Sequence, residues 1–175
     1  MSNFKFCPQC GTPLVEAEHG GRTRIACPDQ ECGFVHWNNP TPVVGAIVER
    51  DGQLIFVQSI GWPSSWYALV TGFLEAGEHP DDAVLREVKE ETGLDAKIGS
   101  FIGMYEFHRM NQLLLVYHVV AEAGEVVIDK TELADFKFVA IEEAKPWPAG
   151  TGIALRDWLR TRGYERDFIA FPPKK

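Results

Sequence analysis

The sequence predicts an α+β domain preceded by a small metal-held module. Apolar segments typical of strands surround a central helix, a second helix lies late in the chain, and all four cysteines fall within the first 32 residues. A length of 175 residues with 45% hydrophobic content allows one ordinary domain with a substantial core, plus a small module. We expect residues 1–38 to form the module and residues 39–175 to form the main domain.

The module is predicted from two close cysteine pairs, each followed by glycine. Turns of this kind present four thiolates to a tetrahedral Zn²⁺, and so short a segment needs the metal for much of its folding free energy. Two disulfides or a redox pair are the alternatives. The predicted zinc ligands are Cys7, Cys10, Cys27 and Cys32.

The expected role of this zinc ribbon is structural or dimer-supporting. Its basic residues are Lys5, Arg22 and Arg24, which are too few for a phosphate footprint, so binding to nucleic acid is not expected. Thr23–Ala26 has the composition of a strand, and 38–42, with two prolines, is typical of a linker.

The strands of the main domain are predicted from apolar runs between turn signals. Val43–Arg50 and Gln53–Gln58 flank Asp51-Gly52, a strong hairpin signal. The late helix is predicted at Ile153–Arg162 from its apolar side. Further strands are expected at Trp66–Thr71, Ala96–Arg109, Leu113–Glu122 and Phe136–Ala140.

The central helix is predicted over Pro80–Thr92. Proline suits the first helical position, and Asp81 and Asp82 favour the positive end of the helix dipole. Gly93 is a natural left-handed stop. The short apolar stripe on this helix consists of Ala83, Val84 and Val88.

Three carboxylates, from Glu87, Glu90 and Glu91, fall on one patch of this helix, because residues three and four apart are neighbours on a helix surface. They repel one another unless a cation lies among them, and hard divalent ions such as Mg²⁺ prefer carboxylate oxygens. Arg86 can hold a carboxylate through a bidentate bond. The alternative is a solvated acidic helix face.

A fixed pattern runs through this region: Gly72, five residues, Glu78, seven residues, and then REVKEETGL over Arg86–Leu94. It resembles the Nudix box, with every fixed position filled over 23 residues. The resemblance implies an α/β/α sandwich with a mixed sheet. It also implies hydrolysis of a nucleoside diphosphate linked to another group, by attack of water on phosphorus with Mg²⁺ or Mn²⁺.

The resemblance implies a role for each residue of the box. The metal ligands would be Glu87, Glu90 and Glu91, with Glu87 or Glu90 also a candidate general base and the Gly72 carbonyl a possible further ligand. Arg86 would orient Glu87, and Glu78 would be its structural partner. Many members add a carboxylate from a later loop, for which Glu132 is the first candidate and Glu122 the second.

The substrate is predicted less closely than the chemistry. A four-cysteine ribbon before a Nudix domain resembles two groups: NADH pyrophosphatases, some of which remove NAD caps from RNA, and shorter pyrophosphatases active on ADP-ribose or FAD. The first group carries a Ser-Gln-Pro-Trp-Pro-Phe-Pro stretch where this chain has Lys97–Gly103, so we favour the second, with AMP as a product. The aromatic residues expected to stack on the base are Trp66, Phe73, Tyr105 and Phe107.

Other functions stay open as alternatives. The chain could be a nucleotide-binding regulator without catalysis, or a hydrolase of damaged nucleoside triphosphates that releases pyrophosphate. A net charge of −8 argues against a polyanionic partner, no apolar run is long enough to span a bilayer, and no secretion signal is visible. We therefore predict a cytoplasmic protein, and the family resemblance implies a homodimer.

Overall fold

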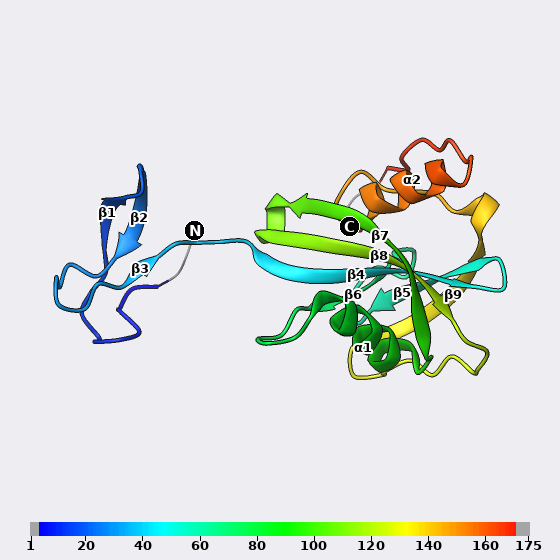
Figure 1. Cartoon of the computed structure of the whole chain (residues 1–175), viewed down its shortest axis with the longest axis horizontal. Coiled ribbons are helices and arrows are strands. Elements are labelled where there is room, and N and C mark those ends of the chain that lie inside the picture. The colour runs from blue at the N-terminus through cyan, green and yellow to red at the C-terminus, as the bar shows by residue number, and fades with distance from the viewer. Residues whose placement is uncertain (1–3, 171–175) are drawn as a thin grey trace. The chain divides into compact units, whose positions relative to one another are not determined.

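The computed structural model describes residues 4–170. The chain divides into two compact units, Met1–Pro40 and Thr41–Lys175 (Figure 1). Among the described residues, no helix has the length and apolar character needed to cross a membrane.

The first unit is a three-stranded antiparallel sheet in the order β1 (Val15–His19), β2 (Arg22–Ala26) and β3 (Val35–His36). The strand expected at Thr23–Ala26 is confirmed as β2. Strands β1 and β3 were not predicted, because β1 carries two glutamates and a histidine in five residues and β3 has only two residues. Their backbone pairing with β2 outweighs these weak local preferences.

The second unit is built on a mixed six-stranded sheet. The order is β7-β8-β4-β5-β9, with β6 also paired to β4; β4 and β8 are parallel and the other pairs are antiparallel. The strands are β4 (Thr41–Arg50), β5 (Gln53–Ser59), β6 (Val70–Phe73), β7 (Ala96–Phe107), β8 (Gln112–Ala121) and β9 (Leu133–Ala140).

Strand β4 organises this sheet because it changes partner along one edge. Its C-terminal part pairs with β5 through the predicted hairpin, where Asp51 and Gly52 both have positive φ, as a two-residue turn requires. Its N-terminal part pairs with β6, placing Val44 opposite Gly72. This pairing fixes Gly72, the first residue of the Nudix-like pattern, beside the central strand of the sheet.

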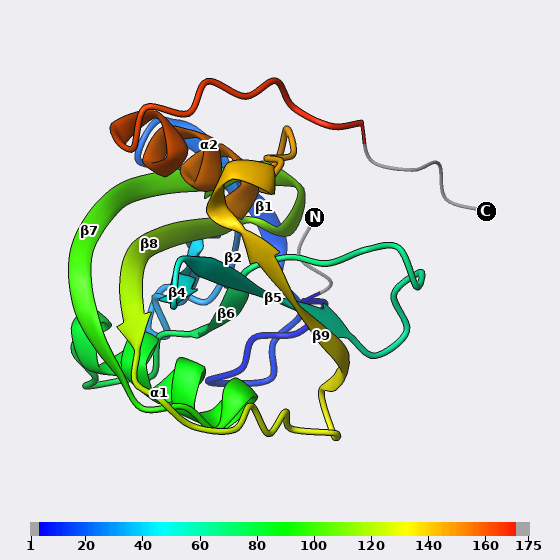
Figure 2. The same ribbon diagram turned by 90° about the vertical axis from the view of Figure 1, so that its right-hand side faces the viewer.

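Helices α1 (Pro80–Thr92) and α2 (Thr151–Thr161) cover opposite faces of the sheet (Figures 1 and 2). Alternation along β4 supplies both cores: Val44 and Val48 pack on the α1 side, and Val43 and Ile47 on the α2 side. Each fully buried aliphatic side chain contributes roughly 1.5–3 kcal/mol. The predicted α/β/α sandwich is confirmed.

The predicted bounds of α1 are confirmed at both ends, with Pro80 at the first position and Gly93 left-handed at the C-cap. The strand predicted at Trp66–Thr71 is wrong in its first half. Only Ala68 forms an isolated bridge there, with Val57, and the strand proper begins at Val70. The end of the strand predicted at Ala96–Arg109 is a 3-10 turn, His108–Met110.

Candidate active site

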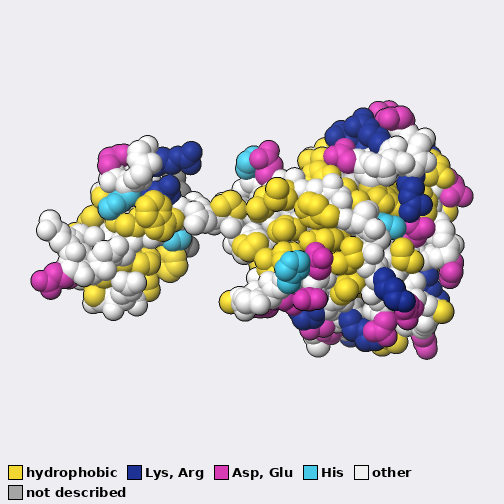
Figure 3. Space-filling model, viewed as in Figure 1, with side chains coloured by type: hydrophobic (Ala, Val, Ile, Leu, Met, Phe, Trp, Pro, Cys, Tyr) yellow, Lys and Arg dark blue, Asp and Glu magenta, His cyan; other side chains and the backbone are white. Residues whose placement is uncertain are grey.

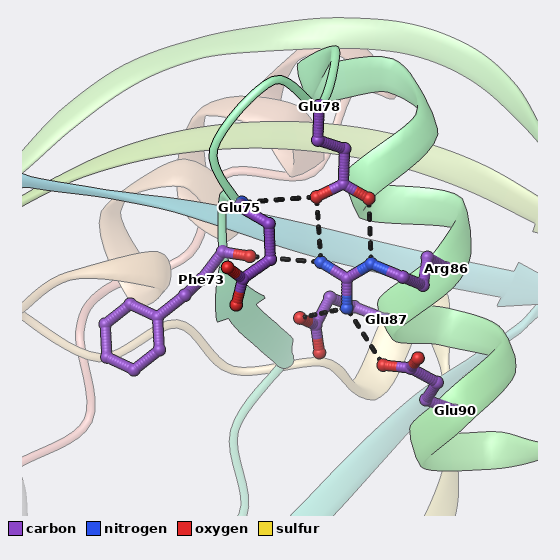
Figure 4. A network of polar contacts seen from close by, with 6 residues as sticks. All are labelled: Phe73, Glu75, Glu78, Arg86, Glu87 and Glu90. Atoms are coloured by element: carbon purple, nitrogen blue, oxygen red, sulfur yellow. Dashed lines mark hydrogen bonds and ion pairs between the residues drawn. The ribbon is translucent and has the colours of Figure 1, made fainter.

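Arg86 is the centre of the polar network that joins α1 to the preceding loop (Figure 4). Its Nε and Nη2 donate to the two carboxylate oxygens of Glu78 at 2.8 and 3.0 Å, so Glu78 is its structural partner as predicted. Nη2 also donates to the Phe73 carbonyl at 3.1 Å. Nη1 donates to Glu87 and Glu90 at 2.7 and 2.9 Å. One guanidinium thus fixes the helix, the loop and two candidate ligands.

Glycine at position 72 makes room for the carboxylate of Glu87. A Cβ on Gly72 would lie 1.7 Å from Glu87 Cδ, so any other residue would displace that carboxylate. Burial is the main cause that raises the pKa of Glu87, and the Arg86 guanidinium opposes it. The first glycine of the pattern therefore serves close approach between β6 and α1.

Glu91 is the most buried carboxylate of the pattern, at 6% exposed. Burial is the largest cause that raises its pKa, to about 8, and the charges of Glu87 and Glu132 add to this shift. A hydrogen bond from the backbone N–H of Thr71 lowers the pKa and so opposes the shift. Its Oε2 is buried without a hydrogen-bond partner among residues 4–170. An enclosed carboxylate oxygen of this kind needs either a proton or a cation.

The structure brings Glu132 to this group and leaves Glu122 away from it. The charge of Glu132 raises the pKa of both Glu87 and Glu91, whereas Glu122 forms an ion pair with Lys97 at 2.7 Å. Asp129, which was not predicted, also raises the pKa of Glu91. Asp129 accepts a hydrogen bond from the Thr131 N–H at 2.8 Å. An aspartate followed by a threonine two residues later is typical of a turn, so the sequence does not mark Asp129 as a site residue.

Glu87, Glu90 and Glu91 are neighbours on α1, as the helical spacing predicts, but their carboxylate oxygens do not converge on one point. Within residues 4–170, the one group whose ligand atoms converge is formed by the four cysteines. The physical reason is Arg86, which draws Glu87 and Glu90 to its own Nη1 while Glu91 lies buried. On the side of the unit that carries α1, Asp and Glu side chains are interspersed with Lys and Arg (Figure 3).

The α1 carboxylates nevertheless fit a divalent metal ion. Glu91 supplies an unsatisfied buried oxygen, Glu87 is lodged in a space that a Cβ would fill, and both are hard oxygen donors. Glu90 is 58% exposed at its side chain and is free to turn. A dication among these groups would remove the repulsion that raises the pKa of Glu91.

The cysteine group fits Zn²⁺. The Sγ atoms of Cys7 and Cys32 are 3.5 Å apart and those of Cys10 and Cys27 are 3.6 Å apart, close to the spacing of about 3.8 Å that Zn–S bonds of about 2.3 Å give in a tetrahedron. All four thiols are free, so the disulfide alternative is wrong for this structure. The Thr12 hydroxyl, 3.3 Å from Cys10 Sγ, lowers the pKa of that thiol to about 6.

A cavity of about 940 Å³ lies beside the box, on the α2 side of the sheet. Gly72 lines it, so the glycine that accommodates Glu87 also borders the cavity. Five chain segments build the walls: the loop before β6, β6 itself, the start of β4, the β7–β8 turn, and the segment that enters α2. The size suits a nucleotide-like ligand.

Three of the four aromatic residues predicted for substrate binding line this cavity: Trp66, Phe73 and Phe107. Tyr105 does not line it, because its side chain packs into the core under α2 and its hydroxyl donates to Asp157 at 3.2 Å. The sequence analysis missed Trp62, Trp147 and Thr151. Trp147 precedes Gly150 by three residues and Thr151 follows it directly, at the entry to α2. Gly-Thr before an apolar helix is the sequence signal that marks this position.

The fold and site are those of a Nudix domain. The features that define it are the mixed sheet, the carboxylate-bearing helix that one arginine binds to the sheet, and the cavity beside them. Residues 39–160 match the family model described as the NUDIX domain. The chain therefore belongs to the Nudix family.

Curated relatives of the chain include a protein of Pseudomonas putida KT2440 called "NAD-capped RNA hydrolase NudC". The two are 28% identical over 170 residues, which is 96% of this chain and 60% of that protein. A protein of the same name from Vibrio parahaemolyticus is 30% identical over 85% of this chain and 56% of its own length. The chain thus spans little more than half the length of these relatives.

The fold is also similar to that of a solved structure, a NUDIX hydrolase from Nitrosomonas europaea. The TM-score is 0.77 at 22% identity, covering 95% of this chain and 97% of that one. At this identity the likeness concerns the fold alone.

Proposed function

We propose that the protein is a metal-dependent hydrolase that cleaves the pyrophosphate bond of a nucleoside diphosphate derivative. The substrate class is an ADP-containing compound such as ADP-ribose, FAD or a related dinucleotide, and one product is AMP. Mg²⁺ or Mn²⁺ is the proposed metal at the carboxylates, and Zn²⁺ the proposed metal at the cysteines.

The observation that carries this proposal is the double role of Gly72. One side of this residue borders the cavity and the other accommodates the Glu87 carboxylate. A ligand whose ring occupies the cavity would therefore extend its diphosphate to the α1 carboxylates. An acidic helix face without this neighbouring cavity would support metal binding only.

The residues have distinct roles in this mechanism. Glu87, Glu90 and Glu91 would hold the metal, and Glu132 adds charge to the same group. A divalent ion bound there neutralises the diphosphate and lowers the pKa of an attacking water. Glu87 or Glu90 would take the proton from that water, and Arg86 would hold the buried Glu87 carboxylate in position through Nη1.

A second candidate substrate is NAD, either free or at the 5′ end of an RNA. It is favoured by the relatives named NAD-capped RNA hydrolases, which are 28–30% identical to this chain. Both candidates share the scissile pyrophosphate and the AMP half, so the carboxylates on α1 would act on either in the same way.

The two units have separate proposed roles. We propose that residues 1–38 are a zinc ribbon that stabilises the protein or a homodimer, and that residues 39–175 perform the hydrolysis. Sedimentation of the protein with and without bound zinc tests the dimer.

Product analysis tests the proposed function. The protein is incubated with Mg²⁺ and, separately, with ADP-ribose, FAD, NADH and a short NAD-capped RNA, and the products are identified by chromatography. AMP or an RNA with a 5′-monophosphate is expected, together with the second monophosphate. Release of inorganic pyrophosphate from nucleoside triphosphates, with none of these substrates cleaved, would contradict the proposal.

A further inference from the structure

The wall of the cavity at the entry to α2 carries polar groups that the proposed chemistry does not use. Helix α2 has 11 residues, and Gly150, with φ of 50°, precedes it without a side-chain cap. The N–H groups of Gly152 and Ile153 donate to the carbonyls of Ala149 and Gly150. The N–H of Thr151 has no acceptor among residues 4–170. This donor lies at the positive end of the helix dipole.

The hydroxyl of Thr151 is a second donor at the same place. Thr151 is only 8% exposed and lines the cavity. Its methyl group packs against Gly45 of β4, 3.3 Å from where a Cβ would lie, so the methyl faces the sheet. The hydroxyl has no hydrogen-bond partner among the described residues. Its oxygen is nevertheless accessible, because it is not one of the fully buried polar atoms without a partner. It is therefore open to the cavity.

The chemistry of the surrounding wall restricts what these donors can bind. Phe107, Trp147 and Leu114 lie close to Thr151 along the cavity wall, and the aromatic side chains favour a flat ring. A phosphate buried among them would lose its hydration without a paired cation. The charged residues of the lining, Glu106 and Arg109, lie on either side of Phe107 in the β7–β8 segment, one of each sign, so they add no net positive charge to the cavity.

We infer that the cavity binds a neutral planar ring that carries a carbonyl oxygen, and that Thr151 is the residue that selects for that oxygen. The inference rests on the proposed function and narrows its substrate class. A nicotinamide carboxamide or a flavin ring has such an oxygen. Adenine has no carbonyl group, and the terminal sugar of ADP-ribose is not a planar ring. Among ADP-containing compounds, the site therefore favours those whose second half is a carbonyl-bearing ring.

Thr151→Val and Thr151→Ser separate this role from a structural one. Valine keeps the volume and removes the hydroxyl, whereas serine keeps the hydroxyl and removes the methyl that packs on Gly45. Thr151→Val should lower kcat/KM for NADH about tenfold, the effect of one buried hydrogen bond, and change that for ADP-ribose less than about twofold. Thr151→Ser should retain the preference of the wild type for NADH. Equal losses on both substrates, or no loss on either, would overturn the inference.

A binding measurement without added divalent metal tests the inference independently of hydrolysis. Reduced nicotinamide mononucleotide, whose ring is neutral, and AMP are titrated while tryptophan fluorescence is followed, since Trp62, Trp66 and Trp147 line the cavity. Reduced nicotinamide mononucleotide should bind more tightly than AMP, and Thr151→Val should lower that affinity ratio about tenfold. Equal affinity of the wild type for the two ligands overturns the inference even if hydrolysis is found. A wild type that binds with this preference but cleaves no substrate contradicts only the proposed function.

Discussion

The two candidate metal sites of this protein differ in how closely their ligand atoms lie together. In the cysteine group, all four ligand atoms lie within 4.8 Å of one another. On α1, Glu87 and Glu90 are bound to Arg86, and Glu91 is buried without a contact to that arginine among the described residues. Backbone turns hold the four thiols close together, whereas the ion pairs with Arg86 keep the carboxylates of Glu87 and Glu90 from gathering around one point.

This difference follows from the work proposed for each site. A structural Zn²⁺ site is closed by four protein ligands, while a catalytic site keeps positions for water and substrate. Arg86 binds two of the proposed ligands, and we propose that Glu90, the exposed one, leaves Arg86 when a metal ion binds. The predictions below test the two sites against each other.

The largest effect is expected from Glu91→Gln. Loss of this carboxylate should lower pyrophosphate cleavage about 10³-fold, because a metal ion contributes several kcal/mol of charge stabilisation. The same change should stabilise the metal-free fold by about 1 kcal/mol or more, since it removes a buried charge. Steady-state kinetics and thermal unfolding measure the two effects, with Glu142→Gln as an exposed control.

The pH dependence of unfolding sharpens this prediction. The folded-state pKa of Glu91, about 8, lies above its ordinary value of 4.5, so its contribution to stability is complete below pH 4.5 and is lost as pH rises towards 8. Without divalent metal, the wild type should lose stability over this window more than Glu91→Gln does. Identical pH profiles for the two proteins would contradict the burial argument.

Gly72→Ala should come next, with a loss of activity of about 10²-fold. The added Cβ meets the Glu87 carboxylate and forces it away from β6. Gly124→Ala is the matched control, because its Cβ would meet only one Leu94 methyl, at 3.3 Å. Comparable activity of the two variants would show that the position of Glu87 does not matter.

Arg86→Lys is expected to lower activity about 10- to 100-fold, the range found when outer groups that orient metal ligands are changed. Lysine keeps the charge but cannot bind Glu78 with two nitrogens while also holding Glu87. Part of the loss should appear as weaker Mg²⁺ activation, which a metal titration measures. Arg160→Lys, an exposed arginine on α2, is the control.

The smallest effect on hydrolysis is expected from Cys10→Ser. This change should abolish stoichiometric zinc, measured by elemental analysis, and unfold the first unit, which depends on metal for stability. Since the carboxylates lie in the other compact unit, kcat should change by only about twofold. A loss as large as that of Glu91→Gln would contradict a purely structural role for the ribbon.

The parts of the fold that depend on local signals were predictable from the sequence. The bounds of α1 follow from Pro80 and Gly93, and the β4–β5 hairpin follows from Asp51-Gly52, because caps and tight turns are specified by a few adjacent residues. Strand β6 was misplaced because its pairing with β4, and not its own sequence, decides where it begins.

Features that depend on contacts between distant segments could not be predicted. The hydrogen bond from Arg86 to Glu90 is one example, because the loop before α1, through Phe73 and Glu78, helps to position the guanidinium. A partly exposed cluster at the C-terminal end of α2 is a second example, in which Glu49 accepts from both His118 and Arg162, at 2.8 and 2.7 Å. The cavity is a third, because no local pattern joins its five wall segments.

The most direct test of the account is a crystal structure with Mn²⁺ and a non-hydrolysable ADP-ribose analogue, with data collected at the manganese edge. We predict anomalous peaks at ligand distance from Glu87 and Glu91, Glu90 turned from Arg86 to the ion, and the diphosphate of the analogue beside Gly72. Anomalous peaks absent from α1, with the diphosphate bound elsewhere on the protein, would contradict it.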